Sequence, residues 1–203
     1  MTAVELENNF KKFSEDLQGD AMAKIMVNIG SEARFYIYDR ITKTGTNSKG
    51  EKYKSPGYGG YSTKSMLSGC KGFVNESKCP AISKEKRKAL KWVTIERKGK
   101  NYRLYEIPGG YKEFKRLNGY TSEFVDFKFR NDMWPDITII HDIMAARQGQ
   151  ITISTLHDEQ QRKLKWNTAK FGDILMVNKT EEQKLADYMN EELEKLIVNN
   201  GLK

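Results

Sequence analysis

Apolar side chains near the start of the chain recur at steps of three and four residues, the pattern of a helix with one buried face. A first helix is predicted from Val4 to Leu17, with Gly19 as its end. Asp20 then caps a second, longer helix, in which Gly30 costs about 1 kcal/mol relative to Ala and could mark a bend. The apolar positions of this helix are expected to be core: Met22, Ile25, Met26, Ile29, Ala33, Tyr36 and Ile37.

In the middle of the chain, the spacing of apolar side chains changes to every second residue. Residues Trp92 to Glu96 and Tyr102 to Ile107 alternate between apolar and polar side chains, with a turn signal around Lys98 and Gly99. These features predict a β-hairpin.

The stretch from Pro108 to Trp134 is expected to join two halves of the molecule. Its Pro-Gly-Gly sequence breaks the preceding strand, and YKEFKRL, from Tyr111 to Leu117, predicts about two helical turns. A strand is predicted from Phe124 to Arg130, followed by a short helix or turn with Met133 and Trp134. Alternation places one set of strand residues toward the core and the other away from it: Val125, Phe127 and Phe129 against Asp126, Lys128 and Arg130.

Two further strands are predicted from Ile137 to His141 and from Ile151 to Leu156. A helix capped by Asp158 and ended by Gly172 follows, with Leu164 facing inward. Thr180 and Gln183 have the spacing of a capping box. The last helix then carries an apolar face of Leu185, Met189, Leu193 and Leu196, and its acidic residues lie elsewhere: Glu181, Glu182, Asp187, Glu191, Glu192 and Glu194.

These elements predict an α+β protein, and the length of 203 residues favours a single domain. Its expected parts are N-terminal helices (1–41), an extended arm (42–77), a basic segment with the hairpin (78–107), and a sheet with C-terminal helices (108–203).

The expected arm is rich in Gly, Ser, Thr and Lys and shows no sustained period. Its tyrosines, Tyr53, Tyr58 and Tyr61, alternate with Lys and Gly. This mixture suits stacking on nucleic-acid bases, and it equally suits a protein interface.

Charge is concentrated rather than spread along the chain. The net charge is +8, and residues 78 to 100 contain nine Lys and Arg against two Glu. Such a block can attract phosphate, although a solvated face or ion pairing with an acidic neighbouring subunit is the favoured interpretation. Two cysteines, Cys70 and Cys79, do not make a disulfide framework, and no apolar run reaches the length of a membrane span. A soluble protein of a reducing cytoplasm is therefore expected.

Candidate chemistry is sparse. His141 and His157 stand beside carboxylates, but no nucleophile motif, metal-ligand spacing or phosphate loop accompanies them. We therefore expect no catalytic residue, no metal and no cofactor.

Three stretches resemble a known family. They are RITKTGTNSKGEKY to YSTKSM (Arg40 to Met66), GGYKEFKRLNGYTSEFVDFKFRNDMWPDI (Gly109 to Ile137) and KLKWNTAKFGDILMVNKTEEQKLADYMNEEL (Lys163 to Leu193). In this order they resemble the Mu-like virion-morphogenesis family of tailed phages and the related tail-completion, or neck, proteins. The chain departs from the family pattern at Phe129-Arg130-Asn131 and in its basic block.

The resemblance implies a curved antiparallel sheet packed with long N-terminal and C-terminal helices. It implies a structural protein that forms a ring at the head–tail junction of the virion, assembled in the cytoplasm of the bacterial host. Other neck, portal-adaptor or tail proteins would be its partners, and double-stranded DNA would pass through the ring. Candidate subunit contacts are Tyr53, Tyr58, Tyr61, Tyr111 and Phe114; candidate channel or inter-subunit cations are Lys84, Lys86, Arg87, Lys88, Lys91, Lys98 and Lys100.

Three alternatives remain open at this point. A tail terminator that caps the tail tube would have the same family features. A sequence-independent nucleic-acid-binding module would use the basic block and the tyrosines. A hydrolytic enzyme would use His141 and His157, without a supporting motif.

Overall fold

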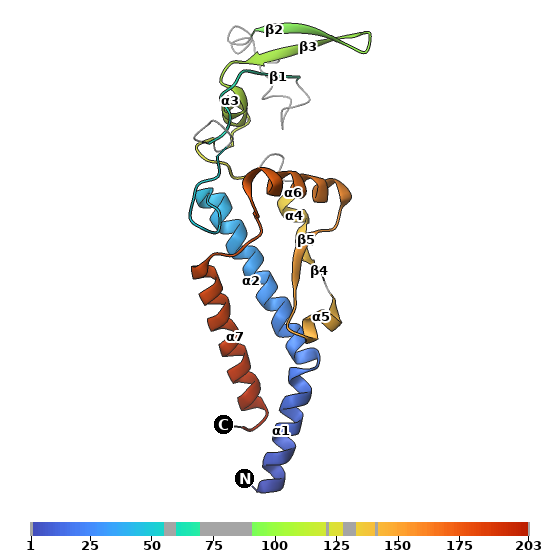
Figure 1. Cartoon of the computed structure of the whole chain (residues 1–203), viewed down its shortest axis with the longest axis vertical. Helices are drawn as coiled ribbons and strands as arrows, with labels where there is room; N and C mark the ends of the chain where they lie inside the picture. Colours follow the sequence, from blue (N-terminus) through green and yellow to red (C-terminus); the bar gives the residue numbers. More distant parts are fainter. Residues whose placement is uncertain are drawn as a thin grey trace. The chain divides into compact units, whose positions relative to one another are not determined.

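The computed structural model describes residues 2–54, 60–69, 91–120, 122–127, 133–140 and 142–202. The fold is mixed α+β, as predicted, with helices and two small antiparallel sheets (Figure 1). Contacts divide the chain into two compact units. Unit 1 contains Met1–Arg40, Asn47–Gly50 and Met133–Lys203; unit 2 contains Ile41–Thr46 and Glu51–Asp132.

Unit 1 begins with the two predicted helices, which are confirmed. Helix α1 (Ala3–Leu17) is capped by Thr2, whose side chain and backbone exchange hydrogen bonds with Glu5. Helix α2 (Asp20–Thr44) extends into the stretch expected to be an arm. None of the helices in the described part of the chain is long and apolar enough to cross a membrane.

The predicted core face of α2 is buried at Ile25, Met26, Ala33 and Ile37. Gly30 lies on this face for a reason that helix propensity does not reveal. A Cβ atom at this position would stand 3.0 Å from the Cγ1 of Ile151 and 3.3 Å from the side chain of Ile139. The glycine therefore allows the β-hairpin of unit 1 to approach the helix backbone.

That hairpin consists of β4 (Ile137–Ile140) and β5 (Thr152–Thr155), which pair antiparallel with Ile139 opposite Ile153. Both strands were predicted. Helix α4 (Met133–Asp136) precedes them and places Trp134 edge-on against Tyr38. Helix α5 (Ile143–Arg147), in the connection between the strands, was not predicted.

Helices α6 (Asp158–Phe171) and α7 (Lys179–Asn199) complete unit 1. Gly172 is the C-cap of α6, as predicted, whereas the N-cap is His157 rather than Asp158. The predicted capping box of α7 is wrong, because the box is made by Asn178 and Glu181. In Figure 1, α2 runs between α7 and the β4–β5 hairpin.

Unit 2 is built on a three-stranded antiparallel sheet of order β1-β3-β2. Its strands are β1 (Met66–Ser68), β2 (Trp92–Arg97) and β3 (Lys100–Ile107). The predicted β2–β3 hairpin is confirmed, and both turn residues have positive φ: 53° at Lys98 and 69° at Gly99. These angles match a type I′ turn, which suits the twist of a two-residue hairpin.

Apart from Asn47–Gly50, the described parts of the expected arm belong to this unit. Strand β1 lies within the arm and pairs with Tyr105 to Ile107 of β3. Helix α3 (Gly110–Leu117), which was predicted, packs its Phe114 with Tyr105 and Ile107 in the core of the unit. The stretch expected to be a free loop thus supplies part of the sheet.

Two predictions about the sheet are wrong. Residues 124–127, the described part of the strand predicted from Phe124 to Arg130, form no strand, and Phe127 has a φ of 52°, which is not an extended conformation. Lys128, Phe129 and Arg130 lie outside the described residues. Val125 and Asp126 are both buried, so the alternation does not separate an inner from an outer face. Among the described residues the strands form two separate small sheets, one in each unit, instead of one larger sheet.

Gly30→Val is expected to lower the free energy of unfolding by about 1–3 kcal/mol, because the added methyl groups would overpack against Ile139 and Ile151. Chemical denaturation measures the change. Ser31→Val is the matched control, since it introduces the same β-branched residue at an exposed position of the same helix. Equal stability of the two variants would contradict the close approach.

Candidate functional site

A buried charge cluster joins three segments of unit 2. The Nζ of Lys115 lies 2.7 Å from Oδ1 of Asp126, and the two side chains are 0% and 2% exposed. The hydroxyl of Tyr61 donates to the same Oδ1 at 2.6 Å and accepts from the backbone N–H of Asp126 at 3.1 Å. We call Tyr61, Lys115 and Asp126 the Lys115 cluster.

Aromatic rings surround the cation of this cluster. The Nζ of Lys115 lies 4.9 Å from the ring centroid of Tyr61 and 5.1 Å from that of Tyr120. Burial, together with the charge of Asp126, raises the pKa of Tyr61. The same two causes, burial first, raise the pKa of Tyr111 to about 12. Both phenols are therefore protonated at neutral pH, and Tyr61 can act as a donor to the carboxylate.

Backbone contacts fix the segment that carries Tyr61. The N–H of Lys112 in α3 donates to the carbonyl of Ser62 at 3.1 Å. Gly110 has a φ of 64°, and a Cβ there would lie 2.3 Å from the carbonyl oxygen of Lys64. Only glycine permits this approach. Because the Lys115 amine has no exposed surface, the cluster connects these segments in the interior of unit 2.

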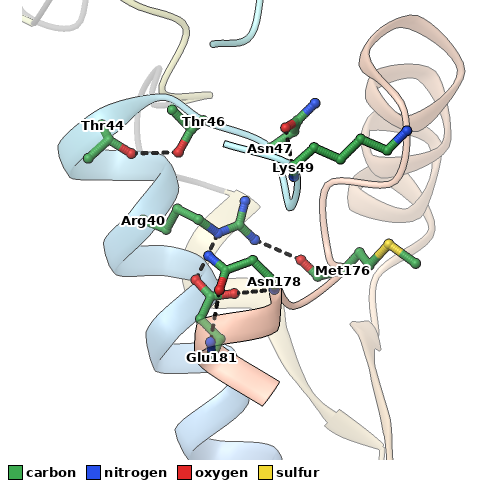
Figure 2. Close-up of polar contacts among 8 residues, drawn as sticks. All are labelled: Arg40, Thr44, Thr46, Asn47, Lys49, Met176, Asn178 and Glu181. Carbon is green, nitrogen blue, oxygen red and sulfur yellow. Dashed lines mark hydrogen bonds and ion pairs between the residues drawn. The ribbon is translucent and has the colours of Figure 1, made fainter. Parts of the chain in front are cut away.

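A second buried ion pair lies in unit 1 (Figure 2). The Nε of Arg40 lies 2.8 Å from Oε1 of Glu181, and the side chains are 8% and 9% exposed. Arg40 also donates to the carbonyl of Met176 at 2.7 Å. The backbone N–H of Asn178 donates to Oε2 of Glu181 at 2.7 Å, while the N–H of Glu181 donates to the Asn178 side chain at 2.8 Å.

One carboxylate thus caps α7 and neutralises a cation from α2. This corrects the expectation that Glu181 belongs to an exposed acidic face. The rest of α7 agrees with the prediction in most positions: its apolar residues are half-buried, and Glu182, Asp187, Glu191 and Glu194 are exposed. Glu192 is half-buried and pairs with Lys195.

The predicted aromatic contact residues are enclosed mainly by their own chain. Tyr53, Tyr61 and Phe114 are buried, and Tyr53 packs edge-on against Phe127 with 4.9 Å between ring centroids. As side chains of the unit 2 interior, these three present little surface to a second subunit. Tyr111 is half-buried against Tyr61 and Phe114. Tyr58 lies outside the described residues.

The predicted basic residues fall into two groups. Lys91, Lys98 and Lys100 are exposed on or beside the β2–β3 hairpin. Arg103 extends this group and was missed because the basic block was taken to end at Lys100; it lies over the Trp92 ring, 4.3 Å from the centroid. The remaining candidates lie outside the described residues: Lys84, Lys86, Arg87 and Lys88.

His157 pairs through Nδ1 with Asp136, and this hydrogen bond lowers the pKa of the Asp136 carboxyl. His141, Cys70 and Cys79 lie outside the described residues. In the part of the chain that is described, no group of three or more His, Cys, Asp and Glu could hold a metal ion.

Comparison with known proteins gives no match: no family model, no curated protein and no solved structure is similar to the chain.

Lys115→Met is expected to cost about 3–5 kcal/mol in the free energy of unfolding, because Asp126 would be left buried without its cation. Lys112→Met, at an exposed position of the same helix, should change stability by less than about 0.5 kcal/mol. Adding Asp126→Asn to Lys115→Met should recover most of the loss, since the amide oxygen can still accept from Tyr61. Equal stability of the two single variants, Lys115→Met and Lys112→Met, would show that the Lys115–Asp126 pair is not needed for the stability of the fold.

Glu181→Gln is expected to cost about 3 kcal/mol, because Arg40 would lose the negative charge of Glu181 within a mostly buried site. Glu182→Gln, at the exposed neighbouring position, should cost less than about 1 kcal/mol. Thermal and urea unfolding of both variants would measure the difference. A loss for Glu182→Gln as large as that for Glu181→Gln would attribute the effect to the helix dipole.

Proposed function

We propose that this protein is a structural component of a tailed-phage virion that forms a ring at the head–tail junction, through which DNA passes. The proposal starts from the three stretches that resemble virion-morphogenesis and tail-completion proteins. It is supported by where the residues of those stretches lie in the structure.

The first two stretches meet in the Lys115 cluster. Tyr61 belongs to the stretch from Arg40 to Met66, whereas Lys115 and Asp126 belong to the stretch from Gly109 to Ile137. The carbonyl oxygen of Lys64, in the first stretch, lies close to the backbone of Gly110, in the second stretch. The residues that carry the resemblance therefore build one buried element of unit 2.

The first and third stretches meet in the other buried pair. Arg40 is the first residue of the first stretch, and Glu181 lies in the stretch from Lys163 to Leu193. Motifs far apart in sequence are thus joined by two buried ion pairs. This observation carries the proposal, because a chance likeness of short motifs would not be expected to concentrate on the residues that build the fold.

The surface of unit 1 suits an assembling subunit. Large apolar side chains are exposed on several of its helices, including Phe35, Ile143, Met144 and Trp166, and Met176 is exposed on the segment before α7. Extensive exposed apolar surface commonly marks protein contacts. A closed ring needs two complementary surfaces on each subunit, and the acidic face of α7 together with the basic hairpin offers charges of opposite sign.

In this role the protein contacts copies of itself and other neck, portal-adaptor or tail proteins at the head–tail interface of the virion. A tail terminator, which closes the tail tube, is the alternative within the same class. The two differ in the partner that the ring binds: a portal or adaptor for a neck protein, and the tail tube for a terminator.

We expect the purified chain, alone or co-expressed with the proteins encoded beside it, to form closed rings of one fixed stoichiometry. Electron microscopy and native mass spectrometry would measure ring formation. Capture by a portal complex or by tail tubes would then separate neck protein from terminator. A well-ordered chain that stays monomeric at every concentration and enters no particle would overturn the proposal.

A further inference from the structure

The β2–β3 hairpin has an inner and an outer half with different surroundings. At the inner end, Tyr105 is fully buried and its ring lies 3.7 Å from that of Trp92. Among the described strands, β1 pairs only with Tyr105 to Ile107, so the outer half of the hairpin has two described strands (Figure 1). Of the ten residues from 94 to 103, nine are exposed and Ile95 is half-buried. We call residues 94–103 the outer ribbon.

Cations dominate the outer ribbon. It carries Arg97, Lys98, Lys100 and Arg103 against one carboxylate, Glu96. No ion pair joins these cations to another described residue. Arg97 and Lys100 stand directly opposite each other in the ladder, an arrangement that destabilises a hairpin. An anionic partner outside the chain would remove that repulsion.

The cations lie on both faces of the ribbon. Because side chains alternate along a strand, Arg97 and Lys100 share one face, whereas Arg103 shares the other with Trp92. Arg103 is held in place by its stacking over the Trp92 ring, which reduces the ordering cost of binding. A flat acidic protein surface would meet only one of these faces. A groove with phosphates on both walls would meet both.

The dimensions agree with such a groove. The four ribbon residues in each strand, at about 3.3 Å per residue, give a reach of about 13 Å. The major groove of B-DNA is about 12 Å wide and about 8.5 Å deep, and it admits a two-stranded β-ribbon.

We propose that the outer ribbon binds double-stranded DNA by entering a groove and contacting phosphates through Arg97, Lys98, Lys100 and Arg103. The contacts are to the backbone, so binding is independent of sequence. This inference stands on the hairpin itself and holds whether or not the chain forms a ring.

Fluorescence anisotropy with a labelled duplex of mixed sequence tests the proposal, using the full-length chain over a series of salt concentrations. The ribbon variant combines Arg97→Gln, Lys98→Asn and Lys100→Gln. Asn followed by Gly99 is a favoured type I′ turn, so the hairpin should be retained, and circular dichroism and thermal melting would verify this. The matched control removes three exposed lysines from α1 and α2: Lys11→Gln, Lys12→Gln and Lys24→Gln.

The unmodified chain should bind the duplex, and the ribbon variant should bind at least about tenfold more weakly at low salt. The plot of log binding constant against log salt concentration should become shallower: the magnitude of its negative slope should decrease by about 2.7, which corresponds to three lost phosphate contacts. The control should lose much less on both measures.

Three results would overturn the proposal: no duplex binding by the unmodified chain, equal losses for the ribbon variant and the control, or single-stranded DNA of the same length bound as tightly as duplex. Size-exclusion chromatography of the same samples reports ring formation separately, so failure of one proposal is distinguishable from failure of the other.

Discussion

Unit 2 depends on the pairing of one buried cation. Lys115 has no access to water, and an ammonium group in that position is tolerated only when a carboxylate and hydrogen bonds replace its hydration. Asp126 supplies the charge, and Tyr61 holds the carboxylate in place. The charge is therefore paired only when three segments are in place: helix α3, the segment before β1 and the segment from 122 to 127. The cost of an unpaired charge makes this arrangement specific, even where its net contribution to stability is small.

Unit 1 uses the same physical device at a different place. Arg40 and Glu181 connect the C-terminal part of α2 to the first turn of α7, and the cap of α7 shares the carboxylate. Close packing elsewhere on α2 depends on the absence of a side chain at Gly30. Polar pairing and a glycine contact thus fix which elements meet, while the apolar faces supply most of the burial.

The proposed DNA contact requires an exposed element that is held by a packed core. The apolar core of unit 2 holds the base of the β2–β3 hairpin through Tyr105, and the outer ribbon leaves that core with its charges uncompensated. A recognition element placed on a fixed base loses little conformational freedom on binding. The exposed apolar side chains of unit 1 are different residues from the cations of the outer ribbon, so apolar contacts between subunits and DNA contact need not compete for the same side chains.

The sequence by itself determined the local elements. Periods of three to four residues located α1, α2 and α3, and a Lys-Gly turn between alternating stretches located the β2–β3 hairpin, because these signals depend only on neighbouring residues. The sequence also placed Lys98 and Lys100 in a basic segment. Only the tertiary structure decided that Tyr61, Lys115, Asp126 and Glu181 are buried, and that residues 122–127 form no strand. A charged side chain is assigned to the surface until its partner is known, and an alternating segment becomes a strand only where another strand accepts its hydrogen bonds. Both conditions depend on segments that are distant in the sequence.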